Sequence, residues 1–402
     1  MRDWRGKKMK KILSTLLFLV IGWQTTQAQN LSMYMVLEDS AYQTKATGKA
    51  MGRRPKLGNE VEYQSANKYQ KDAILFMDMI ADTHPYFIKA ERRTEWFAKK
   101  AALLEKCKTI ETDEALADAL NEVLGKLKDR HTTVTTTQQL REATTAARKK
   151  LMESGITSFN PDRAHIMRPH ATVYDYQLFP EQHICYLQFN KCADDPADPF
   201  ASLLNRMFAE MEKENIKTLV VDVQYNSGGN DLYCSQLLDH LYPISQLKNF
   251  AAFTRFSDFM IKHFPNSAEL RKNWESTGHK DELYPEPAPN ANYQQPKRFE
   301  GQVVFVMGPE TFSSAGNLLT LARDNHFGTI IGTTSTFGPS HYGHILPFRF
   351  PNTSVWGSVS IQFFERPDKA KTSEPFMQPD IEVNLDDKDA AWQFIVEKFG
   401  TQ

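Results

Sequence analysis

Two short segments carry residue types that could do chemistry, and each directly follows an apolar run typical of a buried strand. The first is "VVDVQYNSGGN" (220–230), where two glycines follow the strand. The second is "VVFVMGPETFSSAGNLLTLA" (303–322), where Ser313 and Ser314 enter a helix. Such strands alternating with helices predict a mainly parallel sheet, and sites in these sheets form beyond the carboxyl ends of the strands. We therefore expect both segments to contribute to one site.

A serine at a helix N-terminus has two interpretations. As an N-cap, its hydroxyl accepts a hydrogen bond from a backbone N–H group that has no partner within the helix. As a nucleophile, it has adjacent N–H groups and the helix dipole ready to stabilise an oxyanion. Gly228 and Gly229 could supply a further N–H group, because glycine lets the backbone approach closely. Either segment alone is a weak signal.

Five segments, taken in order along the chain, resemble the tail-specific, or carboxyl-terminal-processing, serine proteases. They are "LKDRHTT", "TLVVDVQYNSGG", "TFSSAGNLLTLARDN", "GTIIGTTSTFG" and "SEPFMQPDIEV", and they cover roughly residues 120–383. The resemblance implies an α/β fold class with a crotonase-like ββα spiral protease core, which agrees with the strand–helix alternation. Helical periodicity over 61–130 predicts a helical N-terminal domain before that core. The implied activity is that of a serine-type peptidase, a hydrolase acting on peptide or unfolded protein substrates through an acyl-enzyme.

Carried over residue by residue, the resemblance places the nucleophile at Ser313. The N–H groups of Ser314 and of Gly228 or Gly229 would form the oxyanion hole. Ser314 is adjacent to Ser313 and can be confused with it.

The general base divides the family into two branches. One branch has a lysine in a Phe-Gly-Lys turn roughly two dozen residues after the nucleophile. Here the turn reads "FGPS" (337–340), and no lysine lies between Ser313 and Lys369. The other branch, which resembles the tricorn core protease, uses the histidine of the "Asp-x-His" segment, here His131. An imidazole with an ordinary pKa of about 6.5 suits that work at neutral pH.

Three further residues are candidates for the remaining roles. Tricorn-type sites use a glutamate before the "Pro-Asp" segment, and Glu374 lies one residue from that place. His341 and His344 flank the turn without a lysine and are alternative bases. As a metal pair they lack a nearby third ligand, so neither a metal nor another cofactor is expected.

The sequence also departs from the family. Gln224 replaces the usual Arg, Arg130 replaces the usual Gly, and Gly316 replaces the usual Glu. These departures motivate an alternative from another class: a catalytically inactive relative that binds a peptide or an apolar ligand in the same cleft. The stretch between the "Asp-x-His" segment and the core is also too short for the PDZ domain that many members carry.

The N-terminus has the layout of a secretory signal peptide, with basic residues, a short apolar run (12–23) and small or polar residues up to Ala28. Cleavage after Ala28 would export the chain to the periplasm or the cell exterior, and membrane attachment would require an uncleaved segment. The predicted organisation is a signal peptide (1–28), a helical N-terminal domain (29–136), a helical and loop connector (137–171) and the protease-like core (172–402), which contains an irregular insertion (257–300).

Net charge and cysteine content limit the binding partners and the disulfide bonds that we expect. A formal net charge of −1 over 402 residues leaves no strong basic field, so nucleic acid is not an expected partner. Four cysteines remain after cleavage, namely Cys107, Cys185, Cys192 and Cys234, and they are compatible with two disulfide bonds in any of three connectivities or with free buried thiols. The oligomeric state is not predicted.

Overall fold

The computed structural model describes residues 35–37, 60–127, 129–153, 167, 173–263, 267–278, 281–286 and 297–400. The predicted signal peptide lies outside these residues. The chain divides into two compact units, and the first consists of the segments before residue 158, Ala252–Glu286 and Tyr342–Phe364. The second unit contains the remaining segments. Within the described residues, no helix has both the length and the apolar character needed to cross a membrane.

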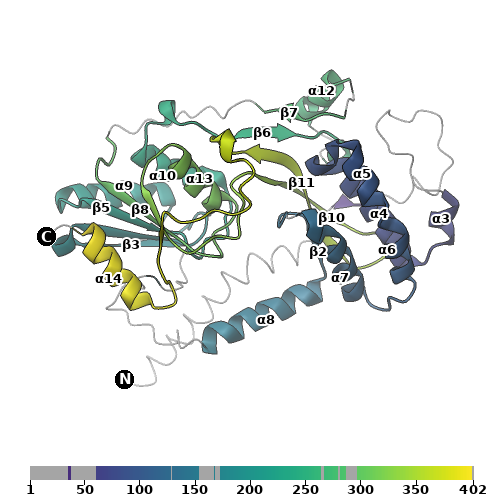
Figure 1. Cartoon of the computed structure of the whole chain (residues 1–402), viewed down its shortest axis with the longest axis horizontal. Coiled ribbons are helices and arrows are strands. Elements are labelled where there is room, and N and C mark those ends of the chain that lie inside the picture. The colour runs from purple at the N-terminus through teal and green to yellow at the C-terminus, as the bar shows by residue number, and fades with distance from the viewer. Residues whose placement is uncertain are drawn as a thin grey trace. The chain divides into compact units, whose positions relative to one another are not determined.

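A six-stranded sheet forms the centre of the second unit (Figure 1). In spatial order its strands are β12 (Ile381–Glu382), β9 (Thr329–Gly332), β8 (Gln302–Met307), β5 (Thr218–Asp222), β4 (Ile184–Phe189) and β3 (Tyr174–Phe179). All neighbouring pairs are parallel except β3 and β4, which are antiparallel. The predicted mainly parallel sheet is confirmed.

Helices cover both faces of this sheet. On one face lie α9 (Phe200–Lys213), α10 (Asp231–Leu241) and α13 (Ser314–Asp324), and on the other lies α14 (Lys388–Phe399). Along β5, Leu219 and Val221 pack with the first group of helices, whereas Val220 packs with α14. Successive side chains of a strand point to opposite faces, so a strand covered on both sides needs the continuous apolar run seen here.

Helices and a second sheet make up the first unit. The helices before residue 158 are α3 (Glu60–Ser65), α4 (Lys68–Thr83), α5 (Ala90–Phe97), α6 (Lys100–Cys107), α7 (Asp113–Leu124) and α8 (Thr137–Glu153). Asn67 and Gln70 form a capping box that begins α4, and the helix ends before Pro85, because the residue before a proline disfavours the helical conformation. The expected helical N-terminal region is therefore present.

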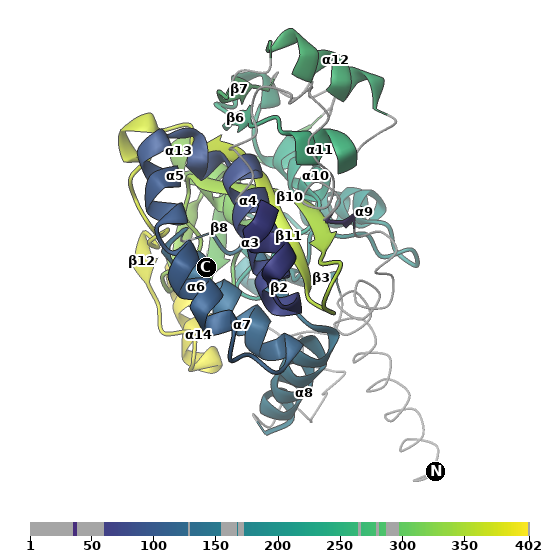
Figure 2. The same ribbon diagram turned by 90° about the vertical axis from the view of Figure 1, so that its right-hand side faces the viewer.

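The second sheet takes most of its strands from later parts of the chain. Its strands are β1 (Met35–Val36), β10 (His341–Arg349), β11 (Trp356–Glu365), β6 (Ala251–Thr254) and β7 (Tyr284–Pro285), with β2 (Thr133–Thr135) paired to β11. Helix α4 lies beside β10 and β11 (Figure 2). Apolar side chains of these strands, such as Phe348 and Ile361, share one core with Phe76 of α4. The N-terminal helices thus belong to a mixed α/β unit.

The structure corrects the sequence analysis in the segment 257–300. This segment was expected to be irregular, but its described residues include α11 (Asp258–His263), α12 (Ala268–Ser276) and β7. Trp274 and Phe259 anchor these helices in the core of the first unit. The long strands β10 and β11 were not predicted. All four cysteines are buried free thiols.

Candidate active site

Ser313 stands where β8 has ended and α13 begins. Its backbone has φ 53° and ψ −125°, a combination that residues other than glycine avoid and that costs about 1–3 kcal/mol. The Ser313 side chain makes no capping hydrogen bond to α13. The N-cap interpretation therefore does not describe Ser313, and backbone strain of this kind is concentrated at functional sites.

The neighbouring Ser314 is bound differently. Its buried hydroxyl donates a hydrogen bond to the carbonyl oxygen of Gly229, at 2.8 Å. The backbone N–H of Ser314 belongs to the first residue of α13, and the first N–H groups of a helix have no partner within the helix. This arrangement favours Ser313 as the nucleophile and Ser314 as a backbone donor to an oxyanion.

The two glycines after β5 pack closely against other backbone segments, Gly228 against Ser313 and Gly229 against Cys192. A Cβ atom on Gly228 would lie 2.7 Å from the Cβ of Ser313 and 2.9 Å from the carbonyl oxygen of Phe312. A Cβ on Gly229 would lie 2.1 Å from the carbonyl oxygen of Cys192, and Gly229 also has a φ of 143°. Both positions require glycine, because no side chain fits between the loop and its neighbours.

Asn226 decides between the two glycines as oxyanion donors. Its side chain is fully buried, and its Oδ1 accepts the N–H of Gly228 at 2.8 Å. Its Nδ2 donates to the carbonyl oxygen of Phe189 at 2.9 Å, which fixes the amide. The Gly228 N–H already donates to Asn226 and is not directed into the predicted oxyanion hole. The geometry therefore favours the Gly229 N–H as the oxyanion donor.

Asp129 organises the predicted base in the first unit. The side chain is 1% exposed, and its Oδ2 accepts hydrogen bonds from His84 Nε2 at 3.0 Å, Thr132 Oγ1 at 2.6 Å and Ser360 Oγ at 2.7 Å. Its Oδ1 accepts the backbone N–H of His131 at 2.9 Å and lies 3.4 Å from His131 Nδ1. Three chain segments therefore hold this carboxylate beside the imidazole.

The Asp129 carboxyl beside His131 is ionised although it is buried. Burial alone would raise the pKa of the Asp129 carboxyl, but hydrogen bonds from His131 and His84, and the charges these imidazoles carry when protonated, hold it well below its ordinary value. The carboxylate is therefore ionised at neutral pH. A carboxylate at Nδ1 of a histidine orients the ring and leaves Nε2 to accept a proton.

Sequence analysis did not assign Asp129 a role, although the residue lies in the "LKDRHTT" segment. The two-residue spacing from His131 was a usable signal. The contacts from His84 and Ser360, which make the position rigid, are distant in sequence and could not be predicted from it.

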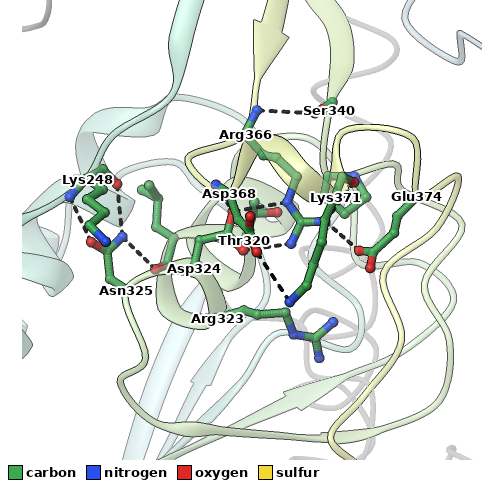
Figure 3. A network of polar contacts seen from close by, with 12 residues as sticks. Lys248, Thr320, Arg323, Asp324, Asn325, Ser340, Arg366, Asp368, Lys371 and Glu374 are labelled. Carbon is green, nitrogen blue, oxygen red and sulfur yellow. Dashed lines mark hydrogen bonds and ion pairs between the residues drawn. The ribbon is translucent and has the colours of Figure 1, made fainter.

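Glu374 takes part in a buried ionic network (Figure 3). The side chain of Arg366 is 0% exposed and donates to Glu374 Oε2 and to both carboxylate oxygens of Asp324, at 2.6 and 3.0 Å. The Glu374 carboxyl itself is 41% exposed. The observed partner of Glu374 is thus an arginine that anchors the end of α13, and nothing in this network orients a histidine.

The alternative bases lie in different surroundings. His341 packs its ring 4.5 Å from that of Phe337, and Phe337 in turn packs against α13 at Gly316. His344 pairs its Nδ1 with Gln362 Oε1 at 3.0 Å in the first unit. His341 shares the second unit with Ser313 and stays the stronger alternative. No three His, Cys, Asp or Glu side chains in the described ranges are grouped so as to hold a metal ion.

Two departures from the family pattern have local structural reasons. A Cβ on Gly316 would lie 2.2 Å from the Phe337 ring, so the glycine makes room for an aromatic side chain over α13. Gln224 is buried, donates to Asp222 Oδ2 at 2.8 Å and accepts from Lys388 Nζ at 2.9 Å. The lysine supplies a positive charge near the place where the family usually has arginine.

The comparisons with known proteins identify the family of the chain. The family model described as peptidase family S41 matches residues 183–383, and the chain belongs to that family. It follows that the chain is of a peptidase class.

Solved structures with the same fold share little sequence. A putative peptidase from Parabacteroides merdae is 16% identical with a TM-score of 0.51, over 78% of this chain and 89% of that chain. Mature CPAF is 12% identical with a TM-score of 0.57, over 84% of this chain and 96% of that chain. No curated protein matches the sequence significantly. These similarities establish the fold.

Proposed function

We propose that the chain is an exported serine peptidase that hydrolyses peptides or unfolded proteins through an acyl-enzyme on Ser313. The observation that carries the proposal is the strained backbone of Ser313, with the glycine loop packed against it. A strained residue at a strand-to-helix turn exposes its hydroxyl beside N–H groups of the helix start, which is the geometry acyl transfer requires.

In this mechanism each group has one task. The Ser313 hydroxyl attacks the scissile carbonyl while His131 removes its proton and later gives it to the leaving amine. The N–H groups of Ser314 and Gly229 stabilise the negative charge that develops on the carbonyl oxygen. Asp129 is a positioning residue that keeps the imidazole in the orientation and tautomer needed to accept the proton. Its ionised state and its 3.4 Å approach to His131 Nδ1 support this role.

Hydrolysis of dye-labelled unfolded casein tests the assignment of the nucleophile and the base. Ser313→Ala and His131→Ala should each lower the rate by at least ~10³-fold, and Asp129→Asn by roughly 10²–10⁴-fold, while circular dichroism stays unchanged. Ser314→Ala and His344→Ala are the matched controls and should stay within about tenfold of the wild type.

Other outcomes would assign the nucleophile or the base to a different residue, or would support the inactive alternative. Loss in Ser314→Ala with activity retained in Ser313→Ala would move the nucleophile by one residue. Loss in His341→Ala with activity retained in His131→Ala would move the base to the turn at 337–340. Saturable binding of casein without turnover, by a folded wild-type chain, would support the inactive alternative.

Export is proposed from the signal-like segment and has its own test. Expression of the full chain in a bacterial host should yield an envelope-located product whose first residue is Gln29. A cytoplasmic product that keeps residues 1–28 would contradict export without bearing on the Ser313 chemistry.

A further inference from the structure

Two cysteines meet directly behind the candidate oxyanion hole. The sulfur atoms of Cys192 and Cys234 are 3.4 Å apart, and both side chains are buried. Cys192 lies shortly after β4, whereas Cys234 lies in the first turns of α10. The two sulfur atoms are thus neighbours, although still farther apart than the roughly 2.05 Å of a disulfide bond.

Both cysteines also contact the segments that shape the site. Cys192 donates its backbone N–H to Gly228 O at 3.1 Å and accepts the N–H of Asn230 at 2.8 Å, so it forms a parallel bridge with Gly229. The Cys234 thiol points to the carbonyl oxygen of Ser314 at 3.3 Å. The cysteine pair therefore lies where the glycine loop, α10 and the start of α13 come together.

We propose that Cys192 and Cys234 are a modification site, at which oxidation forms a disulfide bond that fixes the glycine loop against the start of α13. The oxidant is an external disulfide, either of a thiol–disulfide oxidoreductase or of a small molecule. One thiolate attacks that disulfide and releases one thiol, and the second cysteine then displaces the other half as a second thiol. Two cysteine thiols are oxidised, and one disulfide is reduced to two thiols.

The surroundings of the pair determine when this reaction takes place. The hydrogen bond with Cys192, together with burial, raises the pKa of the Cys234 thiol well above its ordinary value. The reactive thiolate is therefore rare in the folded chain, and the bond forms mainly while the chain folds or opens locally. Once formed, it closes a loop that contains all of β5 and the glycine turn, and so restrains the unfolded chain.

Counting free thiols tests the proposal on the full chain. The chain is purified under reducing conditions and then either dialysed or refolded from urea in a buffer of oxidised and reduced glutathione. It is next denatured without reductant and alkylated with iodoacetamide. The expected result in the refolded sample is two alkylated cysteines, Cys107 and Cys185, and a peptide map linking Cys192 to Cys234. Cys185→Ala is the matched control, because Cys185 is equally buried in β4 and its loss should leave that link intact.

Three results would overturn the proposal. They are alkylation of all four cysteines in both samples, stable glutathione adducts on Cys192 or Cys234 without a link, and a link that includes Cys107 or Cys185. Reduction of the linked protein should also lower its Tm by several degrees, and Cys192→Ala should be insensitive to reductant.

An effect on catalysis rests on the proposed function. If Ser313 is the nucleophile, reduction should lower kcat for casein with little change in KM, because the loop that carries the Gly229 N–H is then held less firmly. The thiol count does not depend on turnover, so the disulfide and the peptidase assignment can fail separately.

Discussion

The buried contact between Arg366 and Asp324 offers the sharpest test of how α13 is held. Both side chains are 0% exposed, and the guanidinium donates to both oxygens of the carboxylate at 2.6 and 3.0 Å. Arg366→Met removes the cation and leaves the Asp324 carboxylate with the backbone N–H of Asp368 at 2.9 Å. Breaking a buried pair by removing one partner costs about 3–5 kcal/mol, because the remaining charge stays buried and uncompensated.

Two further variants separate this effect from a general loss of packing. Arg366→Met combined with Asp324→Leu removes both charges and should recover most of the lost stability, since an apolar replacement of a buried ion pair is often nearly neutral. Glu374→Gln should cost less than about 1 kcal/mol, because the Glu374 carboxyl is 41% exposed and water can replace its contact with Arg366.

Urea unfolding followed by circular dichroism at pH 7 measures these differences. The reasoning predicts a large loss for the single arginine variant, a recovery in the double variant and a small effect at Glu374. A cost below 1 kcal/mol for Arg366→Met, or an equal cost for Glu374→Gln, would refute it. A Glu374→Gln variant that is stable but hydrolyses no casein would instead return Glu374 to the catalytic machinery.

Three further predictions concern His240, Asp72 and Gly229. His240 packs against Phe208, and burial lowers the pKa of its imidazole from 6.5 to about 4. The unfolded chain therefore binds the proton at a higher pH than the native chain, and the free energy of unfolding should fall by about 3 kcal/mol as pH drops from 6.5 to 4. In His240→Gln the urea midpoint should change less with pH over this range. A pH dependence of the midpoint equal to that of the wild type would contradict this prediction. Burial raises the pKa of Asp72 from 3.8 to about 6, so the native state should lose about 3 kcal/mol as pH rises between these values. Asp72→Asn should accordingly unfold at a higher temperature than the wild type at pH 7 but not at pH 3.5, and a lower Tm at pH 7 would count against this assignment. Gly229→Ala places a Cβ 2.1 Å from the Cys192 carbonyl oxygen and should lower casein turnover by at least ~10²-fold, whereas near-normal turnover would exclude Gly229 as a donor.

The parts of the fold that the sequence predicts are those that local pattern determines. β5 and β8 are continuous apolar runs because helices cover both of their faces, and α13 follows a clear strand-to-helix transition. β10 and β11 lack this signal, since only part of each strand is buried and Gly343 and Pro347 interrupt the pattern of β10. β10 and β11 lie next to each other in the sheet, but their other neighbours, β1, β2 and β6, come from segments that are distant in the chain.

In the candidate site, too, local sequence pattern does not predict contacts between distant segments. Motifs locate the two serines and the two glycines, but not which member of each pair has which role. The Ser314 hydroxyl is engaged by Gly229, and the Gly228 N–H by the Asn226 side chain; both contacts join separate segments. The position of Asp129 likewise depends on His84 and on β11, so it is visible only in the folded chain.

The proposed function depends on Ser313 being a reactive nucleophile. The most direct measurement is the intact mass of the purified full chain after incubation with a fluorophosphonate probe, followed by peptide mapping of the adduct. We expect one adduct per chain, located on Ser313, absent from folded Ser313→Ala and retained by Ser314→Ala. Labelling of folded Ser313→Ala at the wild-type rate, or a folded wild-type chain that hydrolyses casein while Ser313 stays unlabelled, would contradict it.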